Sequence, residues 1–391
     1  AAPADPILGL TEQFNADPNP NKVNLGVGVY QDASGKLPLL ECVRKAEERL
    51  IADPKPRPYL PIDGLPTYDA AVKELVFGAD SDAVRQQRVI SVQALGGTGA
   101  LRVGADFLRP HDPDAPVYIS RPSWENHQQL FTRAGFDVRE YRYYDPDRRG
   151  IDFEGMLADL AAAPAGSIVV LHACCHNPTG YDLTQGQWAQ VRATVERGNL
   201  IPFLDMAYQG FSQGLEADAA VVRDFAASGS PMLCATSFSK SFALYGERVG
   251  ALHVVCSDAA EAARVLSQLK TTVRANYSNP PTHGAAIVAS VLQDPQLRAT
   301  WEDELAGMRD RIKLMRQHLL AGLNAAGVSQ DMSFITKQIG MFSYSGLTRD
   351  QMLRLRQDYS VYGTDAGRMC MAGLNDRNID YVSASIAAVL G

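Results

Sequence analysis

The chain has 391 residues, of which 46% are hydrophobic and 21% are charged, and its formal net charge is -7. This length is too great for one small core and predicts a large and a small domain. The composition excludes a disordered or fibrous chain. The acidic balance argues against nucleic-acid binding, which needs clustered Lys and Arg. We therefore expect a folded protein that acts on small molecules.

The cysteines and the apolar runs indicate where the protein works. There are six cysteines, and two of them, Cys234 and Cys256, lie inside apolar runs. This predicts buried free thiols rather than disulfides and fits a reducing cytoplasm. The first residues show neither the basic nor the apolar region of a signal peptide. In the sequence, no apolar run approaches the ~20 residues of a membrane-spanning helix. We therefore expect a cytoplasmic protein with no membrane contact.

Short apolar runs begin to alternate with helix-compatible segments near residue 88. Seven of these runs are predicted to be strands, at 88–94, 117–120, 138–143, 167–172, 200–205, 232–236 and 251–256. Such alternation is typical of a mainly parallel, doubly wound sheet. The sequence therefore predicts a seven-stranded α/β domain.

The last part of the chain predicts a second, α-rich domain. From about residue 294 the strand pattern gives way to predicted helices at 297–325 and 349–358, with one short strand at 340–345. The first segment, 1–45, is too short to fold alone, so it packs onto the C-terminal portion or onto a second subunit. We therefore predict a large domain at 46–293 and a small domain that combines 1–45 with 294–391.

A glycine-rich turn at 96–99 (Gly-Gly-Thr-Gly) separates the first predicted strand from a helical pattern. Backbone N–H groups and the helix dipole at such a point suit a phosphate. The same turn is also ordinary strand-to-helix geometry, so the motif by itself is not specific.

Several polar groups surround Lys240. Ser237 and Ser239 precede it, and Arg248 follows eight residues later. Hydroxyl and guanidinium donors suit a phosphate dianion, and a partly desolvated lysine beside a cation has a pKa below ~10.4. Such an amine can form an imine with an aldehyde. The alternative is an exposed lysine on a serine-rich turn, which its place after an apolar strand disfavours.

Asp205 ends the apolar predicted strand 200–205, and Tyr208 follows three residues later. Burying a carboxylate without a partner costs several kcal/mol, so Asp205 should meet a cation. A protonated pyridine nitrogen would serve. An internal pair with an arginine or a helix N-cap is the alternative.

The segment 172–176 (His-Ala-Cys-Cys-His) invites a zinc interpretation, which we reject. Metal ligands are usually spaced by two or more residues, and the sequence has no second Cys or His cluster to complete the site. No metal is predicted. The following residues 177–180 (Asn-Pro-Thr-Gly) instead indicate a fixed turn that directs the Asn177 amide into the cleft.

Together these segments resemble the fold-type I pyridoxal-phosphate enzymes, specifically the class I aspartate and aromatic-amino-acid aminotransferase family. The resemblance includes the Asp205, Lys240 and Arg248 segments and covers nearly the whole chain. Further matching segments lie at 23–30, 59–62, 123–127, 176–180, 278–281 and 367–370.

The resemblance implies a site for pyridoxal 5'-phosphate. Lys240 would bond to the coenzyme and move the substrate proton, and Asp205 would keep the pyridine nitrogen protonated. Asn177 and Tyr208 would donate hydrogen bonds to the ring oxygen, and Trp124 would stack on the ring. The residues implied to hold the phosphate are Gly97, Thr98, Ser237, Ser239, Arg248 and, from the other subunit, Tyr59. The resemblance therefore implies a homodimer with shared active sites.

The resemblance also implies the substrate contacts, in which Trp124 and Asn177 take part. Arg368 would bind the α-carboxylate bidentately, a geometry that suits a guanidinium, with Gly28 closing above it. Arg274 would cross the dimer interface to the distal carboxylate of aspartate, glutamate or 2-oxoglutarate. One substrate is therefore expected to be a dicarboxylate.

Some segments resemble the bacterial aromatic (tyrosine) aminotransferases more than the aspartate-specific ones. One feature is Gly96, at a position where aspartate-specific members often have serine. The others are the segments 172–175, 202–205 and 277–281. We expect ping-pong amino transfer between tyrosine, phenylalanine or L-aspartate and 2-oxoglutarate. The alternative within the class is a strictly aspartate-specific transaminase.

Two other classes are compatible with the same fold. A coenzyme-binding transcription regulator would need an additional basic DNA-binding domain. A decarboxylase or synthase would retain the lysine and the aspartate but need not retain both Arg274 and Arg368. The presence of both arginines favours transamination of dicarboxylates.

Overall fold

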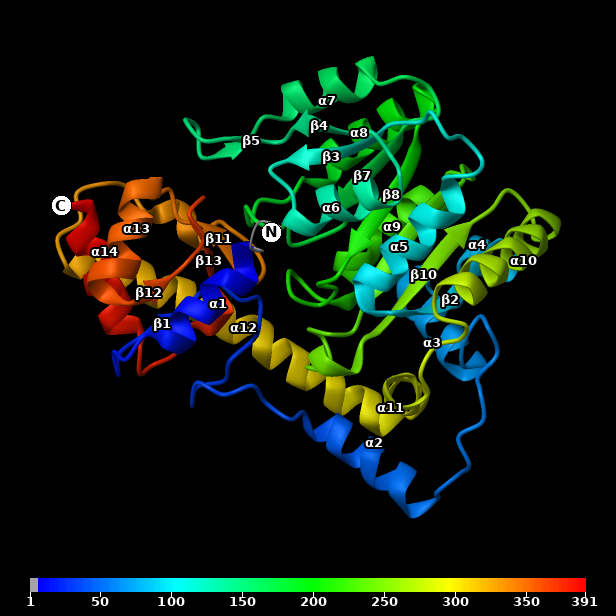
Figure 1. Ribbon diagram of the computed structural model, residues 1–391, viewed down its shortest axis with the longest axis horizontal. Helices are drawn as coiled ribbons and strands as arrows, with labels where there is room; N and C mark the ends of the chain where they lie inside the picture. The colour runs from blue at the N-terminus through cyan, green and yellow to red at the C-terminus, as the bar shows by residue number, and fades with distance from the viewer. Residues whose placement is uncertain (1–5) are drawn as a thin grey trace.

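A computed structural model describes residues 6–391 and contains two lobes joined by one long helix (Figure 1). The larger lobe is built around a sheet with helices on its faces. The smaller lobe combines segments from both ends of the described chain. Helix α12 (Pro295–Ala325) runs from beneath the larger lobe into the smaller one.

The central sheet has the strand order β2-β10-β9-β8-β7-β3-β4. Its strands are β2 (Val89–Leu95), β3 (Val117–Arg121), β4 (Val138–Arg142), β7 (Ile168–His172), β8 (Ile201–Met206), β9 (Met232–Ser237) and β10 (Val249–Val255). Strand β10 is antiparallel to β2 and β9, and the other neighbouring pairs are parallel. Each predicted strand is present with its ends shifted by two residues or fewer, which confirms the mainly parallel seven-stranded sheet.

Successive side chains of the strands enter two separate hydrophobic cores. Phe203 of β8 belongs to one core and its neighbour Leu204 to the other. Because alternate side chains of a strand point to opposite faces, the two cores lie on opposite sides of the sheet. The first core includes helices α5 (Gly96–Leu108), α6 (Glu125–Arg133) and α10 (Ala259–Asn276). The second includes α3 (Pro66–Phe77), α7 (Phe153–Ala162), α8 (Gln185–Arg197), α9 (Leu215–Ala227) and α11 (His283–Gln293).

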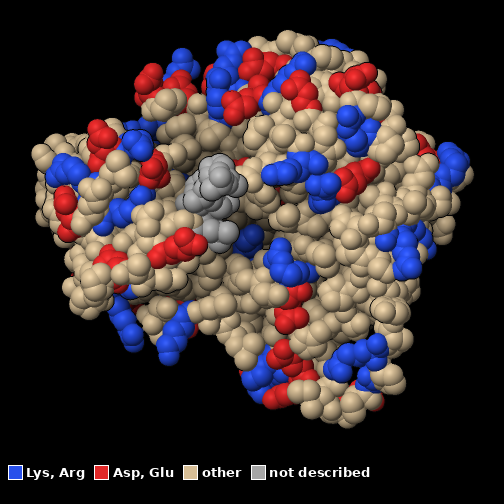
Figure 2. Space-filling model, viewed as in Figure 1, with Lys and Arg blue, Asp and Glu red and all other residues tan. Residues whose placement is uncertain are grey.

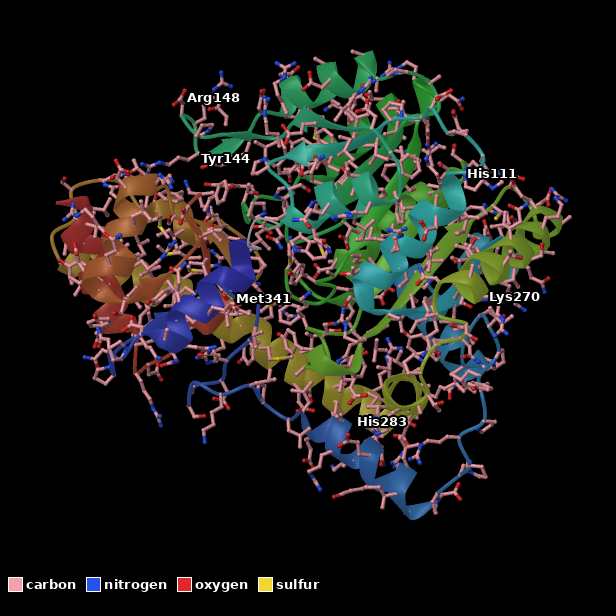
Figure 3. The ribbon with its side chains drawn as sticks, viewed as in Figure 1. His111, Tyr144, Arg148, Lys270, His283 and Met341 are labelled. Carbon is pink, nitrogen blue, oxygen red and sulfur yellow. The ribbon has the colours of Figure 1, made fainter. Side chains whose placement is uncertain are left out.

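A short hairpin, β5 (Tyr144–Asp145) and β6 (Gly150–Ile151), extends from the larger lobe toward the smaller one. Figure 3 shows Tyr144 and Arg148 on this extension. The ring of Tyr144 lies edge-on to the ring of Tyr344, with 5.2 Å between centroids. The hairpin therefore provides a direct contact between the lobes.

The smaller lobe is formed mainly by the chain after α12. Its elements are η2 (Ser333–Thr336), β11 (Phe342–Tyr344), α13 (Arg349–Tyr359), β12 (Val361–Tyr362), β13 (Arg368–Cys370), η3 (Met371–Gly373) and α14 (Ile379–Leu390). Helices α12 and α13 occupy the two predicted helical stretches. Strand β11 is shorter than predicted because it pairs with only the three residues of β13.

The N-terminal segment contacts both lobes. Helix α1 (Pro6–Ala16) leads to β1 (Val23–Asn24), which pairs in parallel with β12 of the smaller lobe. Helix α2 (Glu41–Ala52) then packs against α11 and α12. The predicted boundary at residue 45 lies inside α2, whereas the boundary at 293–294 directly precedes α12. The division into 1–45, 46–293 and 294–391 stays a prediction.

The structure also bears on membrane helices, metal sites, the cysteines and the surface charge. Within residues 6–391, no helix is long and apolar enough to cross a membrane, and no group of three or more His, Cys, Asp or Glu is arranged to hold a metal ion. The six cysteines are buried, and each is a free thiol. Basic and acidic side chains are interspersed over the face shown in Figure 2.

Candidate active site

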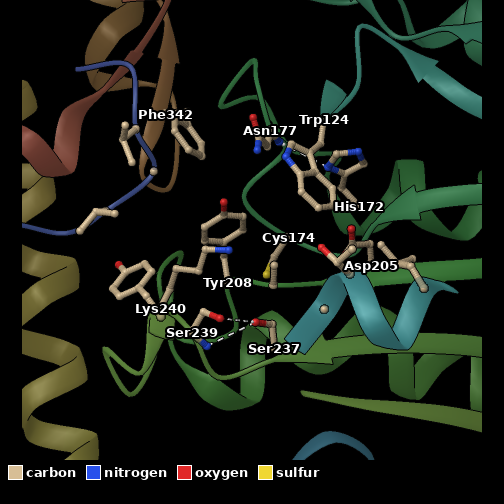
Figure 4. A pocket seen from close by; sticks show the side chains of 18 of the residues that line it. Trp124, His172, Cys174, Asn177, Asp205, Tyr208, Ser237, Ser239, Lys240 and Phe342 are labelled. Atoms are coloured by element: carbon tan, nitrogen blue, oxygen red, sulfur yellow. Dashed lines mark hydrogen bonds between the residues drawn. The ribbon is translucent and has the colours of Figure 1, made fainter. Parts of the chain in front are cut away.

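A cavity of about 570 Å³ opens at one edge of the central sheet (Figure 4). Strands β2, β7, β8 and β9 all end there, and the antiparallel β10 begins there. Residues at or just beyond these strand ends therefore converge, as expected for a ligand site in an open α/β sheet. From the other side, Val27 to Val29 and two residues of the smaller lobe, Phe342 and Arg368, complete the lining.

The cavity brings together all but two of the predicted site residues. Those that line it are Gly28, Gly97, Thr98, Trp124, Asn177, Asp205, Tyr208, Ser237, Ser239, Lys240, Arg248 and Arg368. Tyr59 and Arg274 are exposed and lie outside this lining. Both had been expected to act on the cavity of a second subunit.

One end of the cavity is rich in hydrogen-bond donors, and we call it the phosphate cradle. Its members are Gly97, Thr98, Ser237, Ser239 and Arg248. Ser239 N and Ser239 Oγ lie 3.3 and 3.2 Å from Ser237 Oγ, and Arg248 Nη1 lies 3.5 Å from Ser239 Oγ. Together with the N-terminus of α5, these groups present donors that could hold a phosphate dianion.

The glycine turn before α5 differs in one respect from the prediction. Helix α5 already begins at Gly96 rather than after the four glycine-rich residues. Gly96 has a φ of 68°, and a Cβ there would lie 2.5 Å from Arg248 Nη2. Because a side chain would collide with that guanidinium, glycine at this position lets Arg248 approach the helix N-terminus.

Lys240 lies on the turn after β9, where its Nζ is 4.9 Å from the centre of the Tyr208 ring. Burial lowers the pKa of its ammonium to about 8, with Arg248 acting in the same direction and Asp205 opposing. An amine with this pKa has an appreciable neutral fraction near pH 7, unlike an ordinary lysine. Lys240 can therefore act as a nucleophile and as a base.

Asp205 at the end of β8 is tied to a histidine that the sequence analysis did not assign. Its Oδ2 lies 2.8 Å from His127 Nε2, and His127 is completely buried. Burial raises the pKa of Asp205, but the hydrogen bond and charge of His127 outweigh this and hold it below its ordinary value. Because an ionised carboxylate only accepts hydrogen bonds, His127 Nε2 carries the proton.

The hydrogen-bond network of Asp205 and His127 extends to His172 at the end of the neighbouring strand β7. His127 Nδ1 lies 2.8 Å from Ser123 Oγ, which lies 3.1 Å from His172 Nε2. The register of β7 and β8 places His172 opposite Asp205. Burial, followed by the charge of His127, lowers the pKa of His172 to about 3, so His172 is neutral. Asp205 therefore meets a histidine rather than the arginine or helix N-cap considered as alternatives.

The opposite end of the cavity contains Arg368, whose side chain is 3% exposed. Its Nη1 donates to Asn177 Oδ1 at 3.1 Å and its Nη2 to the Gly26 carbonyl at 2.7 Å, and Phe342 packs 4.3 Å from the guanidinium carbon. In the described part of the chain, its buried Nε has no partner. Buried donors are normally paired, so this guanidinium is arranged to receive an anion.

Gly28 lies above this end, next to Phe342. A Cβ at Gly28 would lie 2.7 Å from Phe342 Cζ, so the backbone of residues 27–29 approaches the ring only because no side chain is present. The sequence analysis named Gly28 but not Phe342. Phe342 lies in an ordinary short strand, and neither periodicity nor spacing marks it as a cavity residue.

Comparisons with known proteins identify the family of the chain. The family model of class I and II aminotransferases matches residues 20–386. The aspartate aminotransferase of Pseudomonas aeruginosa is 55% identical, covering 100% of this chain and 98% of the relative. The aromatic-amino-acid aminotransferase of Escherichia coli K12 is 50% identical, covering 99% and 98%. The chain therefore belongs to the class I and II aminotransferase family, which confirms the resemblance found in the sequence.

A solved structure extends the comparison to the fold. The aromatic-amino-acid aminotransferase of Burkholderia pseudomallei, covalently bound to pyridoxal phosphate, superimposes with a TM-score of 0.98. It is 58% identical and covers 100% of this chain and 98% of its own. The similarity confirms the fold class.

Proposed function

We propose that this aminotransferase uses pyridoxal phosphate and moves an amino group from tyrosine, phenylalanine or L-aspartate to 2-oxoglutarate in two half-reactions. One observation carries the proposal. A single cavity has Lys240, Asp205 and the phosphate cradle on one side and the incompletely paired Arg368 guanidinium on the other.

The residues of the cavity fit pyridoxal phosphate. The phosphate cradle would hold the phosphate, Asp205 would face the ring nitrogen, and Lys240 would bond to the coenzyme. Asn177 and Tyr208 would donate to the ring oxygen, and Trp124 would cover one face of the ring. The covalently bound pyridoxal phosphate of the Burkholderia pseudomallei relative supports the same coenzyme here.

The bound coenzyme supplies a ring that withdraws electrons from the substrate Cα. The remaining tasks belong to the chain. Arg368 binds the α-carboxylate and fixes the position of Cα. Lys240 takes the proton from Cα and returns it, because a base with a pKa of about 8 is effective near neutral pH. Asp205, held anionic by His127, keeps a proton on the ring nitrogen.

The proposal includes a second copy of the chain and a cytoplasmic location. Tyr59 is 91% exposed and Arg274 is exposed as well, so both side chains are free to reach a second copy. In a homodimer, Tyr59 and Arg274 would complete the partner's cavity, Tyr59 at the phosphate and Arg274 at a distal carboxylate. The six buried free thiols are compatible with a reducing compartment.

Arg274 must accommodate two kinds of substrate in this proposal. In the described chain its Nη1 donates to Ser278 Oγ. We predict that Arg274 swings outward or meets water when phenylalanine binds, because a buried unpaired charge costs several kcal/mol. A complex with a phenylalanine analogue in which Arg274 stays dry and in its aspartate-bound position would contradict this prediction.

A strictly aspartate-specific transaminase is the second candidate. The 55% identity to an aspartate aminotransferase favours it, whereas the 58% identity to an aromatic-amino-acid aminotransferase favours the broader specificity. Global similarity therefore does not separate the two, and the substrate has to be tested directly.

The test is a single-turnover half-reaction that follows the visible absorption of the coenzyme after mixing with L-aspartate or L-phenylalanine. We expect the second-order constants to agree within about tenfold, a difference of ~1.4 kcal/mol. A phenylalanine constant lower by orders of magnitude would identify the aspartate-specific enzyme. A spectrum that neither amino acid changes would refute transamination.

A further inference from the structure

A second ionisable side chain lies beside the substrate-binding arginine. Glu125 is the first residue of α6 and directly follows Trp124, which lines the cavity. Glu125 Oε1 lies 3.7 Å from Arg368 Nη1, which is within ion-pair distance but beyond a hydrogen bond. Among the described residues, Glu125 is the only carboxylate within ion-pair distance of Arg368.

Both members of this pair keep an unfilled hydrogen-bonding atom. In residues 6–391, Glu125 Oε2 and Arg368 Nε are buried and have no partner. A pair built only to stabilise the fold would satisfy these atoms, because an open buried donor or acceptor is costly. The carboxylate is therefore held near the guanidinium without occupying it.

The surroundings of Glu125 are electropositive. A carboxylate at the first residue of a helix interacts favourably with the positive end of the helix dipole, and Arg368 adds a full positive charge. The start of α6 is anchored from within the protein, because His127 is bonded to Asp205 at 2.8 Å. The Glu125 side chain is 30% exposed, and its chain neighbour Trp124 lines the cavity.

We propose that Glu125 determines specificity: its charge disfavours the second carboxylate of dicarboxylic substrates relative to the uncharged side chain of aromatic ones. The inference rests on the proposed function, in which Arg368 binds the α-carboxylate that all amino acids share. Any effect of Glu125 on that contact is the same for both kinds of substrate. The distal carboxylate is the part that differs, and a negative charge close to the site repels a second negative charge on the substrate.

Glu125 and Arg274 then act in opposite directions on the same group. Arg274 from a second copy attracts the distal carboxylate, and Glu125 repels it. A phenyl ring carries no charge and is indifferent to both. The relative use of aspartate and phenylalanine therefore reflects the balance between these two residues.

The experiment measures kcat/KM for L-aspartate and L-phenylalanine with the Glu125→Gln holoenzyme. An effect on the binding of the shared α-carboxylate changes both values equally and drops out of their ratio. We expect the ratio of kcat/KM for aspartate to kcat/KM for phenylalanine to rise by about tenfold. Glu125→Asp retains the charge and should keep the ratio within about threefold of the parent. Glu154→Gln removes an exposed carboxylate on α7 and should leave the ratio unchanged.

A binding measurement supplies a readout that does not depend on turnover. Succinate and 3-phenylpropionate carry two carboxylates and one, and neither donates an amino group. Titrating each into the holoenzyme and following the melting temperature gives their relative affinities. Glu125→Gln should bind succinate about tenfold more tightly relative to 3-phenylpropionate than the parent does.

Three results separate the possible failures. A Glu125→Gln ratio within twofold of the parent, in both assays, would overturn the inference. An equal shift in Glu125→Gln and Glu125→Asp would also overturn it, because geometry rather than charge would then be responsible. A parent enzyme that transaminates neither amino acid would instead refute the proposed function.

Discussion

Two buried arginines lie on either side of strand β11, and their surroundings differ. Arg316 of α12 donates to four groups, the carbonyls of Ile335, Gly340 and Phe342 and the hydroxyl of Ser343. Arg368 donates to two groups and leaves a buried Nε open. Burial lowers the pKa of Arg316 to about 10.

The difference separates a structural charge from a binding charge. Both guanidiniums pay for desolvation, but only Arg316 recovers most of it from the protein's own acceptors. In the proposed function, the α-carboxylate of the substrate completes the pairing of Arg368. Lys240 is a third cation of this kind, because burial is the main cause of its lowered pKa and the charge of Asp205 offsets it only in part. Substitutions of these three cations therefore test whether a buried cation with unpaired donors contributes to turnover rather than to stability.

The largest effect is expected for Lys240→Ala. Removing the amine eliminates both the covalent link and the base, so turnover should fall by more than ~10⁴-fold, over 5 kcal/mol, while the coenzyme still binds. Steady-state rates and the coenzyme spectrum measure the two properties. Lys270→Ala, at a partly exposed lysine outside the cavity lining (Figure 3), serves as the control. Residual turnover within a hundredfold of the parent would contradict the assignment of Lys240.

Arg368→Leu should lower kcat/KM by about 1000-fold, or ~4 kcal/mol, for aspartate and phenylalanine alike. The free energy of unfolding should stay the same or rise, because an incompletely paired buried charge is removed. Kinetics and urea unfolding test both parts. A loss confined to one of the two substrates would show that Arg368 does not bind the carboxylate they share.

Arg316→Leu should have the reverse profile. It leaves four acceptors without their donor, so we expect the free energy of unfolding to fall by about 3 kcal/mol. The kcat of the folded enzyme should stay within about threefold of the parent. Urea unfolding and kinetics on the same preparation give both values. An Arg316 variant that is as stable as the parent but inactive would remove the distinction between the two arginines.

The smallest effect concerns Lys240 and pH in the coenzyme-free protein. Its pKa is about 8 in the folded state and near 10.4 when unfolded, so the unfolded chain binds more protons between these values. Stability contributed by this group therefore rises with pH across that window. Lys240→Met should be more stable than the parent at pH 7 by about 2 kcal/mol, and the gap should close toward pH 10.5. A gap that is independent of pH would refute the lowered pKa.

The sequence predicted most of the fold because its strands are local, apolar and bounded by clear breaks. It also predicted the residues at the strand ends, because the carboxyl edge of a parallel sheet collects them. The coenzyme side, with Asp205 and Lys240, could therefore be proposed from the residues alone. The substrate side, with Gly28, Arg274 and Arg368, was reached only through the family resemblance.

Other site residues could not be found in that way. His127 lies within a segment that matches the family. Its hydrogen bond with Asp205, however, depends on how helix α6 is positioned relative to strand β8 in the folded chain. Phe342 enters the cavity from a short strand, and Glu125 lies beside Arg368 at a helix start. Nothing in the local sequence marks either position. Tyr59 and Arg274 lie outside the cavity lining, and their proposed roles depend on a second copy of the chain.

By itself, the sequence determined the order of strands and helices and which chemical groups stand at the strand ends, because periodicity and apolar runs are local properties. The tertiary structure alone decided which buried polar atoms are paired. Arg316 and Arg368 are both arginines on elements of the smaller lobe, and only long-range packing supplies acceptors to one and leaves the other open. The acceptors that pair with a buried arginine come from residues far apart in the chain. Whether all of its donors are paired, the property that distinguishes Arg316 from Arg368, is therefore set only when the chain folds.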